Sequence, residues 1–195
     1  GLVLGIVLNS KILAGTFTNY LVNFWWISIS AVLLILFYYT IVAPINKLQK
    51  PYPKTLDGIA YLKNESFHEY QAINFISNNI KNIDGIVEAV GTDYSRYGRF
   101  SSFTGIPTIL GWPGHQAQWR NQTVEINYRE QDVLNIYKND DKNYVLGLLQ
   151  KYNVSYLIVG PREIKKYQID NPRKFDSYMD VVFKNEEIKI YRIRE

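Results

Sequence analysis

The sequence contains no cysteine and only two histidines, His68 and His115. Without cysteine the chain can form neither a disulfide bond nor a thiolate metal site. Two histidines also cannot supply a metal centre built on clustered imidazoles, which leaves a site of oxygen ligands as the only conceivable kind. We therefore expect neither a metal ion nor a cofactor.

Several functional motifs are missing as well. Neither GxGxxG nor GxxxxGK[ST] occurs, which argues against a nucleotide site, and no GxSxG marks a serine nucleophile. The 22 basic and 18 acidic residues leave a net charge of +4, and the two kinds are interspersed. Nucleic acid is therefore not an expected partner, whereas the small positive surplus could favour anionic lipid or phosphate.

Charge is absent from one long apolar stretch, LVNFWWISISAVLLILFYYTIV, which lies between Tyr20 and Ala43. About 20 apolar residues in a helix are enough to cross the roughly 30 Å hydrocarbon layer of a bilayer. The stretch predicts a transmembrane helix over residues 20–43. The alternative is a helix buried in the core of a soluble protein.

The residues before this helix are apolar too. We interpret residues 1–8, GLVLGIVL, as the end of a preceding membrane helix and residues 9–19 as the loop between the two helices. A cleaved signal peptide is not indicated, because such a peptide has small residues after its apolar run, whereas residues 41–46 read IVAPIN. We expect the chain to be part of a multi-pass protein of the cell membrane.

The orientation of the following domain is not fixed by charge. Lys47, Lys50 and Lys54 follow the helix and would keep the domain cytoplasmic by the positive-inside tendency. Long domains are translocated largely regardless of charge, and three N-glycosylation sequons would permit glycans on an external domain. Both orientations stay open on these grounds.

Residues 44–61 contain three prolines, show no helical period and are expected to form a linker, and residues 62–195 a soluble α/β domain. Within it, DVVFKN and EEIKIYRIR near the end of the chain predict an antiparallel hairpin. The expected fold is a layered α/β sandwich with a mixed, mainly parallel sheet and a C-terminal β-hairpin.

The parallel part of that sheet is predicted from two helix-then-strand units. An amphipathic pattern at 69–80 is followed by a short apolar run at 85–90. A second pattern at 143–152 is followed by a nearly continuous apolar run at 154–160. Consecutive units of this kind favour parallel pairing.

Residues 91–120, here called the central motif, are crowded with glycines, aromatic residues and arginines. Flat aromatic faces suit a sugar ring or a membrane interface, and guanidinium groups suit phosphate or carboxylate. The candidate residues are Tyr94, Tyr97, Trp112 and Trp119 among the aromatics, and Arg96, Arg99 and Arg120 among the arginines. The alternative is a hydrophobic mini-core beneath a long loop, with the arginines bound to backbone carbonyls.

Two further residues carry titratable groups suited to chemistry. Glu88 lies in an apolar run, where burial raises the pKa of a carboxyl unless an arginine pairs with it. We expect Glu88 to be a structural acid clamped by an arginine of the central motif. His115 could act as a general base, or simply as a hydrogen-bonding loop residue, because no nucleophile motif accompanies it.

On these segments the chain resembles the carboxy-terminal part of the YYY family of uncharacterised polytopic membrane proteins. The matching segments are TLDGIAYL at 55–62, VEAVG at 87–91, YSRYGRFSSFTGIPTILGWPGHQAQWR at 94–120, RxxDVxxIY at 129–137, YxVxYLIVG at 152–160 and a closing F…IYRI. The chain departs from the family pattern in two places. Gln116 stands where the family usually has Glu, and Glu163 is followed by Ile164 where the family has an acid and then a base.

The layout of this family is similar to that of the C-type glycosyltransferases, which use polyprenyl-phosphate sugar donors. The resemblance implies an extracytoplasmic domain above a catalytic cavity, with the catalytic carboxylate in an early loop outside this sequence. It also implies membrane lipid, a polyprenyl-phosphate sugar and the remaining helices of the same protein as partners. On this basis the substrate-binding residues are Tyr94, Arg99, Trp112, His115, Trp119 and Arg120.

Three functional hypotheses follow. The first is the terminal helix and external domain of a membrane glycosyltransferase that uses a lipid-linked sugar. The second is a non-enzymatic module that assembles the membrane protein with itself or with an envelope partner. The third is a hydrolase that uses Glu88 and His115.

Overall fold

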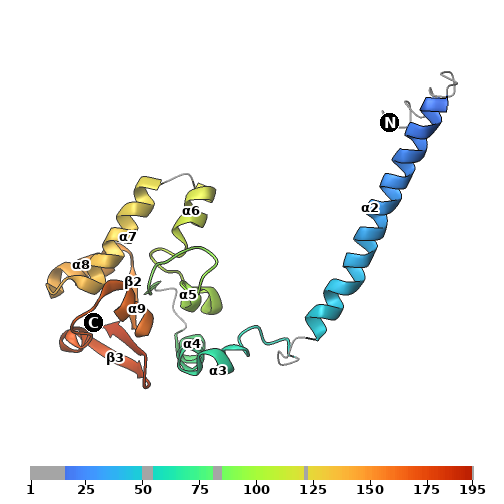
Figure 1. Cartoon of the computed structure of the whole chain (residues 1–195). Helices are drawn as coiled ribbons and strands as arrows, with labels where there is room; N and C mark the ends of the chain where they lie inside the picture. The colour runs from blue at the N-terminus through green and yellow to red at the C-terminus, as the bar shows by residue number, and fades with distance from the viewer. Residues whose placement is uncertain (1–15, 50–54, 81–84, 121–122, 195) are drawn as a thin grey trace. The chain divides into compact units, whose positions relative to one another are not determined.

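The computed structural model describes residues 16–49, 55–80, 85–120 and 123–194, and the chain divides into two compact units, Gly1–Lys54 and Thr55–Glu195. The expected end of a preceding helix at 1–8 lies outside the described residues. The first unit contains a single described helix, α2 (Thr16–Leu48), seen in Figure 1. Its segment Asn19–Leu48 is long and apolar enough to cross a membrane, and its most apolar window has no buried residue.

The helix α2 ends at Leu48 rather than at Ala43, so the first residues of the expected linker are helical. Pro44 lies inside it and removes one backbone N–H donor. A proline of this kind is tolerated in a membrane helix, where polar side chains and small local adjustments accommodate the freed carbonyl.

The second unit is an α/β domain with a sheet of four strands. Its elements are α3 (Leu62–Glu65), α4 (Phe67–Asn79), β1 (Gly85–Val87), α5 (Arg99–Thr104), α6 (Pro113–Arg120), α7 (Thr123–Lys138), α8 (Lys142–Lys151), β2 (Val154–Val159), α9 (Pro161–Tyr167), the 3₁₀ helix η1 (Lys174–Ser177), β3 (Met179–Lys184) and β4 (Lys189–Ile193). The expected α/β class, the mixed sheet and the C-terminal hairpin are confirmed.

The strand order is β1-β2-β4-β3, with β1 and β2 parallel and the other two pairs antiparallel. The sheet is therefore mixed, as predicted, but mainly antiparallel, so the prediction of mainly parallel pairing was wrong. A long crossover joins β1 to its parallel neighbour β2, and a second connection, through α9 and η1, leads from β2 past β4 to β3. The terminal hairpin turns tightly, with the Asn185 N–H donating to the Ile188 carbonyl at 3.0 Å, and adds β4 to β2 in the opposite direction.

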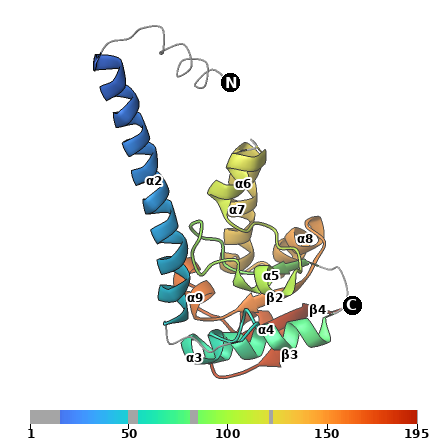
Figure 2. The same ribbon diagram turned by 90° about the vertical axis from the view of Figure 1, so that its right-hand side faces the viewer.

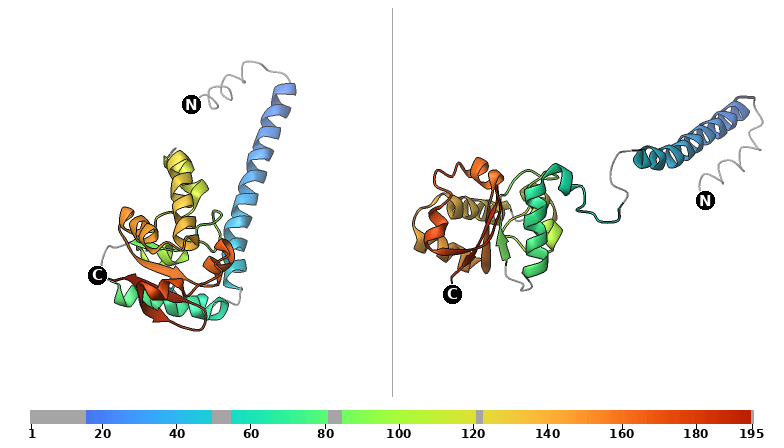
Figure 3. Two further views of the ribbon diagram at one scale, coloured as in Figure 1. Left: turned by 90° about the vertical axis from the view of Figure 1, so that its left-hand side faces the viewer. Right: turned by 90° about the horizontal axis from the view of Figure 1, so that it is seen from below.

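Helices cover both faces of the sheet, as Figure 3 shows. Neighbouring residues of a strand point to opposite faces, so Ile86, Ile158 and Ile190 pack on the side of α4. Figure 2 shows α4 running along β3 and β4. Val87 and Leu157, each next in sequence to one of these isoleucines, pack on the side of α7 and α8. The domain thus has three layers.

One buried tyrosine joins the two parallel strands. The Tyr137 hydroxyl of α7 lies 2.8 Å from the carbonyl oxygen of Ile158 in β2 and 3.2 Å from that of Val87 in β1, and donates to them. Its ring stacks on that of Tyr167 in α9, with ring centres 4.7 Å apart. The side chain is fully buried, and this burial raises its pKa well above the ordinary value, so the hydroxyl stays protonated.

We expect Tyr137→Phe to lower the free energy of unfolding by about 1–2 kcal/mol, because two buried carbonyls lose a donor. Urea unfolding of the chain in detergent, followed by circular dichroism, measures this loss. The control is Tyr128→Phe, which removes a hydroxyl from a side chain that is 64% exposed. Equal stability of the two variants would contradict the role assigned to the Tyr137 hydroxyl.

Candidate functional site

Glu88, the residue after β1, holds the helix α5 of the central motif. The Glu88 side chain is fully buried. Its Oε2 accepts a hydrogen bond from the Phe100 N–H at 3.0 Å, and its Oε1 accepts a hydrogen bond from the Ser101 N–H at 2.8 Å. Both donors belong to the first turn of α5, which is bounded by Gly98 and Gly105 at φ +72° and +74°. Glu88 therefore holds a short helix of the motif against the sheet.

The acid at Glu88 is structural, but its predicted arginine clamp was wrong. Among the described contacts its partners are backbone N–H groups, and no arginine pairs with it. Burial raises the pKa of Glu88 to about 7, although the hydrogen bonds from Ser101 and Phe100 oppose the shift. The carboxyl therefore changes charge near neutral pH.

A second buried carboxylate, Glu163, joins the exits of the two parallel strands. Its Oε2 accepts from the Gly160 N–H at 2.9 Å, which caps α9 after β2, and its Oε1 accepts from the Ala89 N–H at 3.0 Å, just after β1. Burial raises its pKa. The sequence signal for this residue was the helix-start pattern in Gly160-Pro161-Arg162-Glu163, a proline at the first helical position with a glutamate two residues later.

Arg99, predicted to bind substrate, is instead part of an ion network inside the domain. Its Nη1 lies 2.9 Å from Glu69 Oε2, and its Nη2 lies 3.7 Å from Glu65 Oε2. Arg162 binds the other carboxylate oxygen of Glu69 and also donates to the Arg96 carbonyl at 2.7 Å. Glu69 is buried, so two guanidinium groups compensate its charge. The network ties the central motif to α4 and α9.

The other predicted residues gather in one place, here called the aromatic patch: Tyr94, Trp112, His115 and Trp119. Ring centres of Tyr94 and Trp112 are 5.2 Å apart, those of Tyr94 and His115 5.5 Å, and those of His115 and Trp119 6.1 Å. Tyr94 and Trp119 are each 77% exposed. Trp112 is partly buried and its Nε1 donates to the Tyr97 carbonyl at 2.8 Å.

Arg120 ends α6, one residue after Trp119 of the patch. It is exposed, and among the described contacts it makes no ion pair. Its guanidinium thus differs from that of Arg99, because its donors remain available for an external anion. Of Arg99 and Arg120, the two arginines predicted to bind substrate, Arg120 is the one whose position in the structure suits binding of an external anion.

Part of the central motif packs inward, as the alternative from the sequence allowed, but into the two main core clusters of the domain rather than into a separate mini-core. Ile109 and Leu110 are buried in the core cluster on the side of α7 and α8, where Tyr97 also packs, and Phe100 is buried in the cluster on the side of α4. A methyl group on Gly91 would lie 2.0 Å from the Tyr97 ring, so only glycine permits this close approach. The motif thus has a packed inner side and an exposed aromatic patch.

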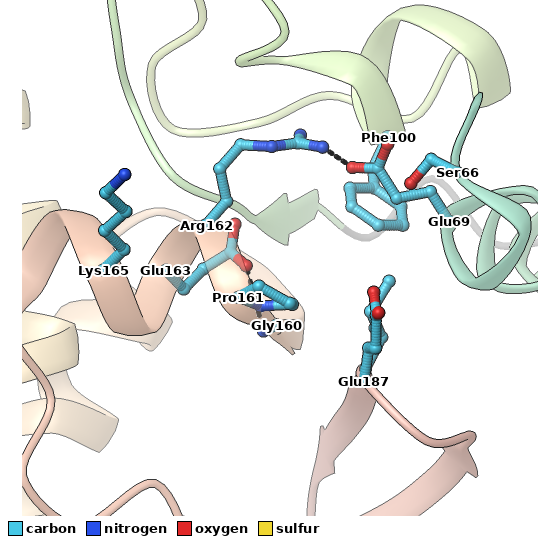
Figure 4. A pocket seen from close by; sticks show the side chains of 10 residues that line it. Ser66, Glu69, Phe100, Gly160, Pro161, Arg162, Glu163, Lys165 and Glu187 are labelled. Carbon is cyan, nitrogen blue, oxygen red and sulfur yellow. Dashed lines mark hydrogen bonds and ion pairs between the residues drawn. The ribbon is translucent and has the colours of Figure 1, made fainter.

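A cavity of about 230 Å³ lies at the carboxyl end of β2, as Figure 4 shows. The start of α9 borders it on one side, and Glu69 of α4 and Glu187 of the β3–β4 hairpin border it on others. Sequence reasoning did not find this cavity, because its lining comes from segments far apart in the chain. Ligand sites of α/β sheets lie preferentially at such strand ends.

His115 and Glu88 do not lie together as a catalytic pair. Glu88 is enclosed beneath α5 and His115 lies in the aromatic patch, with no hydrogen bond between them among the described residues. The described residues also contain no group of three His, Asp or Glu side chains that could hold a metal ion. The described geometry thus offers binding surfaces, and no assembled acid–base pair for the third hypothesis.

No protein-family model matches the chain, and no curated protein matches it in sequence. One solved structure similar to it is the C-terminal globular domain of an oligosaccharyltransferase from Archaeoglobus fulgidus. The two share 9% sequence identity with a TM-score of 0.44, over 64% of this chain and 95% of that one. A likeness of this degree does not assign a function, and membership of the YYY family stays a prediction.

The buried carboxyl of Glu88 predicts that the domain loses stability as pH rises. Its pKa is about 7 in the folded domain and near its ordinary value of 4.5 when exposed by unfolding, so the folded state binds more protons between these values. The free energy of unfolding should fall by about 1–3 kcal/mol between pH 5 and pH 8. Glu163, whose pKa is raised for the same reason, adds to this slope.

The variant Glu88→Gln is expected to be less stable than the wild type at pH 5, because an amide can accept only one of the two backbone hydrogen bonds, and this difference should shrink as pH rises and Glu88 becomes charged. Its stability should depend less steeply on pH, since one titrating group is gone. Urea unfolding at a series of pH values measures both effects. An unchanged slope in Glu88→Gln would show that other groups titrate in this range.

Proposed function

We propose that this chain is the C-terminal part of a multi-pass membrane glycosyltransferase that uses a lipid-linked sugar. Its domain lies on the extracytoplasmic side and binds the polar end of the lipid-linked substrate through the aromatic patch and Arg120. The observation that carries this proposal is the exposure of Tyr94 and Trp119 beside Arg120, an arginine that makes no ion pair with the residues that the structure describes.

The chemistry of the patch fits such a ligand. Aromatic faces stack on the C–H surface of a sugar ring, and both the indole and the phenol are favoured at the interface between lipid and water. A guanidinium binds phosphate oxygens through paired hydrogen bonds. The apolar helix α2 supports a position of the domain near a bilayer, where a lipid-linked sugar is found.

The catalytic residues belong, in this proposal, to the remaining part of the protein. The described residues lack an assembled acid–base pair, and their buried carboxylates are occupied by backbone N–H groups or by arginines. Binding of the substrate by a separate domain would raise its local concentration and orient it for transfer.

A second candidate function is the assembly module, and a specific observation favours it. Val124 and Tyr128 lie one helical turn apart on α7 and are 67% and 64% exposed. They add exposed apolar surface on the helix that follows α6, the helix that carries Trp119. Such a surface could pack against the remaining membrane helices of the same protein instead of a ligand.

Binding of a polyprenyl-phosphate sugar to the chain in lipid nanodiscs tests the proposal. We expect saturable binding that Arg120→Ala weakens about tenfold, the cost of a lost charged hydrogen bond, with a similar loss in Trp119→Ala. Both positions are exposed, so the melting temperature should not change.

The matched controls are Lys138→Ala, an exposed cation at the end of α7, and Tyr144→Ala, an exposed aromatic residue on α8. Neither should alter binding. If the folded chain does not bind the lipid-linked sugar, or if the controls weaken binding as much as the patch variants, the ligand proposal is wrong and the assembly function gains support.

A further inference from the structure

The cavity at the end of β2 is separate in its residues from the aromatic patch. It is lined by Gly160, Pro161 and Arg162 at the start of α9, together with Ser66, Glu69 and Glu187 from other segments. Figure 4 shows Arg162 extending from α9 to the Glu69 carboxylate, with Glu187 in a different part of the lining. Its volume of about 230 Å³ is below the range of pockets for drug-sized ligands, so it suits a small molecule.

The charges around the cavity nearly cancel. Glu69 is bound by Arg99 and Arg162, which leaves one positive charge in that group. The carboxyl of Glu163 is buried in the lining, and at the rim Lys165 and Glu187 have opposite charges. A phosphate or another strongly charged ligand would therefore meet no net attraction here, whereas an uncharged ligand meets no penalty.

The polar groups of the lining can still form hydrogen bonds. Each carboxylate oxygen has about two acceptor positions. The Glu163 oxygens each accept one backbone N–H, from Ala89 and Gly160, so acceptor positions remain. Arg162 and the Ser66 hydroxyl supply donors.

Apolar groups complete the lining. Phe100 and Ile188 are buried side chains, and Pro161 adds a rigid apolar ring. Apolar surface beside planar acceptors and donors is the combination that recognises a polyol, which presents C–H groups on its faces and hydroxyls around its edge.

We propose that this cavity binds one uncharged monosaccharide unit, at a site distinct from the aromatic patch. The inference deepens the proposed function, on which it rests for the choice of a sugar among small polyols. It adds a second subsite, which would hold a sugar residue of the acceptor or of the growing glycan while the patch holds the lipid-linked donor.

Saturation-transfer NMR on the chain in nanodiscs tests this proposal, with glucose, mannose and N-acetylglucosamine as probes and inorganic phosphate as a competitor. We expect saturable binding of at least one sugar that phosphate does not displace. Ser66→Phe, which fills the cavity from its lining, should abolish the signal. Gln150→Phe controls for an added phenyl group, because Gln150 is exposed on α8.

Glu187→Gln keeps the test informative if Ser66→Phe does not fold. This exposed rim residue changes charge but not shape, and losing a charged acceptor should weaken sugar binding about tenfold without lowering the melting temperature. Absence of sugar binding in the folded chain, full binding by both cavity variants, or displacement by phosphate would each overturn the proposal.

The failure of this inference and that of the proposed function are distinguishable through Trp119→Ala. Loss of free monosaccharide binding in Trp119→Ala, with full binding in the cavity variants, would place the sugar on the aromatic patch and overturn the inference alone. If Trp119→Ala does not weaken binding of the polyprenyl-phosphate sugar, the proposed function is overturned, whether or not free monosaccharides bind.

Discussion

The carboxylate of Glu163 ties the exit of β1 to the exit of β2, and the rest of the candidate site depends on this connection. One oxygen accepts the Ala89 N–H and the other the Gly160 N–H, so the segment that leads from β1 into the central motif is held to the start of α9. Glu88, one residue before Ala89, then fixes α5 in the same way. Two buried carboxylates thus replace regular hydrogen bonding where the strands end, and their burial is compensated by backbone N–H groups.

This arrangement separates two surfaces of different chemistry. The central motif packs its inner side through Phe100 and Leu110 and leaves the aromatic patch exposed. Glu69 and Arg162 of the ion network line the cavity, and the charges around it nearly cancel. An exposed aromatic surface next to Arg120, which has no ion pair among the described residues, fits a charged lipid-linked ligand, whereas a nearly neutral cavity fits an uncharged sugar. The two proposals are therefore complementary parts of one binding function.

The sequence predicted the elements whose signal is local. The helix expected at 69–80 is α4, the apolar run at 154–160 contains β2, and the terminal hairpin is present. The apolar run at 85–90 ends as a strand at Val87, because Glu88 turns to cap α5. Of the candidate aromatic residues, Tyr94, Trp112 and Trp119 cluster with His115, whereas Tyr97 packs against the core. The partner of Arg99 was not predictable, since Glu69 lies thirty residues earlier on another element, and α7 was not among the predicted helices.

Hydrogen–deuterium exchange on the chain in nanodiscs, with and without a polyprenyl-phosphate sugar, tests the central claim most directly. The account predicts slower exchange on addition of the ligand at Tyr94 and across α6, Pro113–Arg120, where the patch and Arg120 lie. It predicts no change in α8, which carries none of the patch. If a saturating concentration of the ligand leaves hydrogen–deuterium exchange in α6 of the folded domain unchanged, the claim that this surface binds the lipid-linked sugar is contradicted.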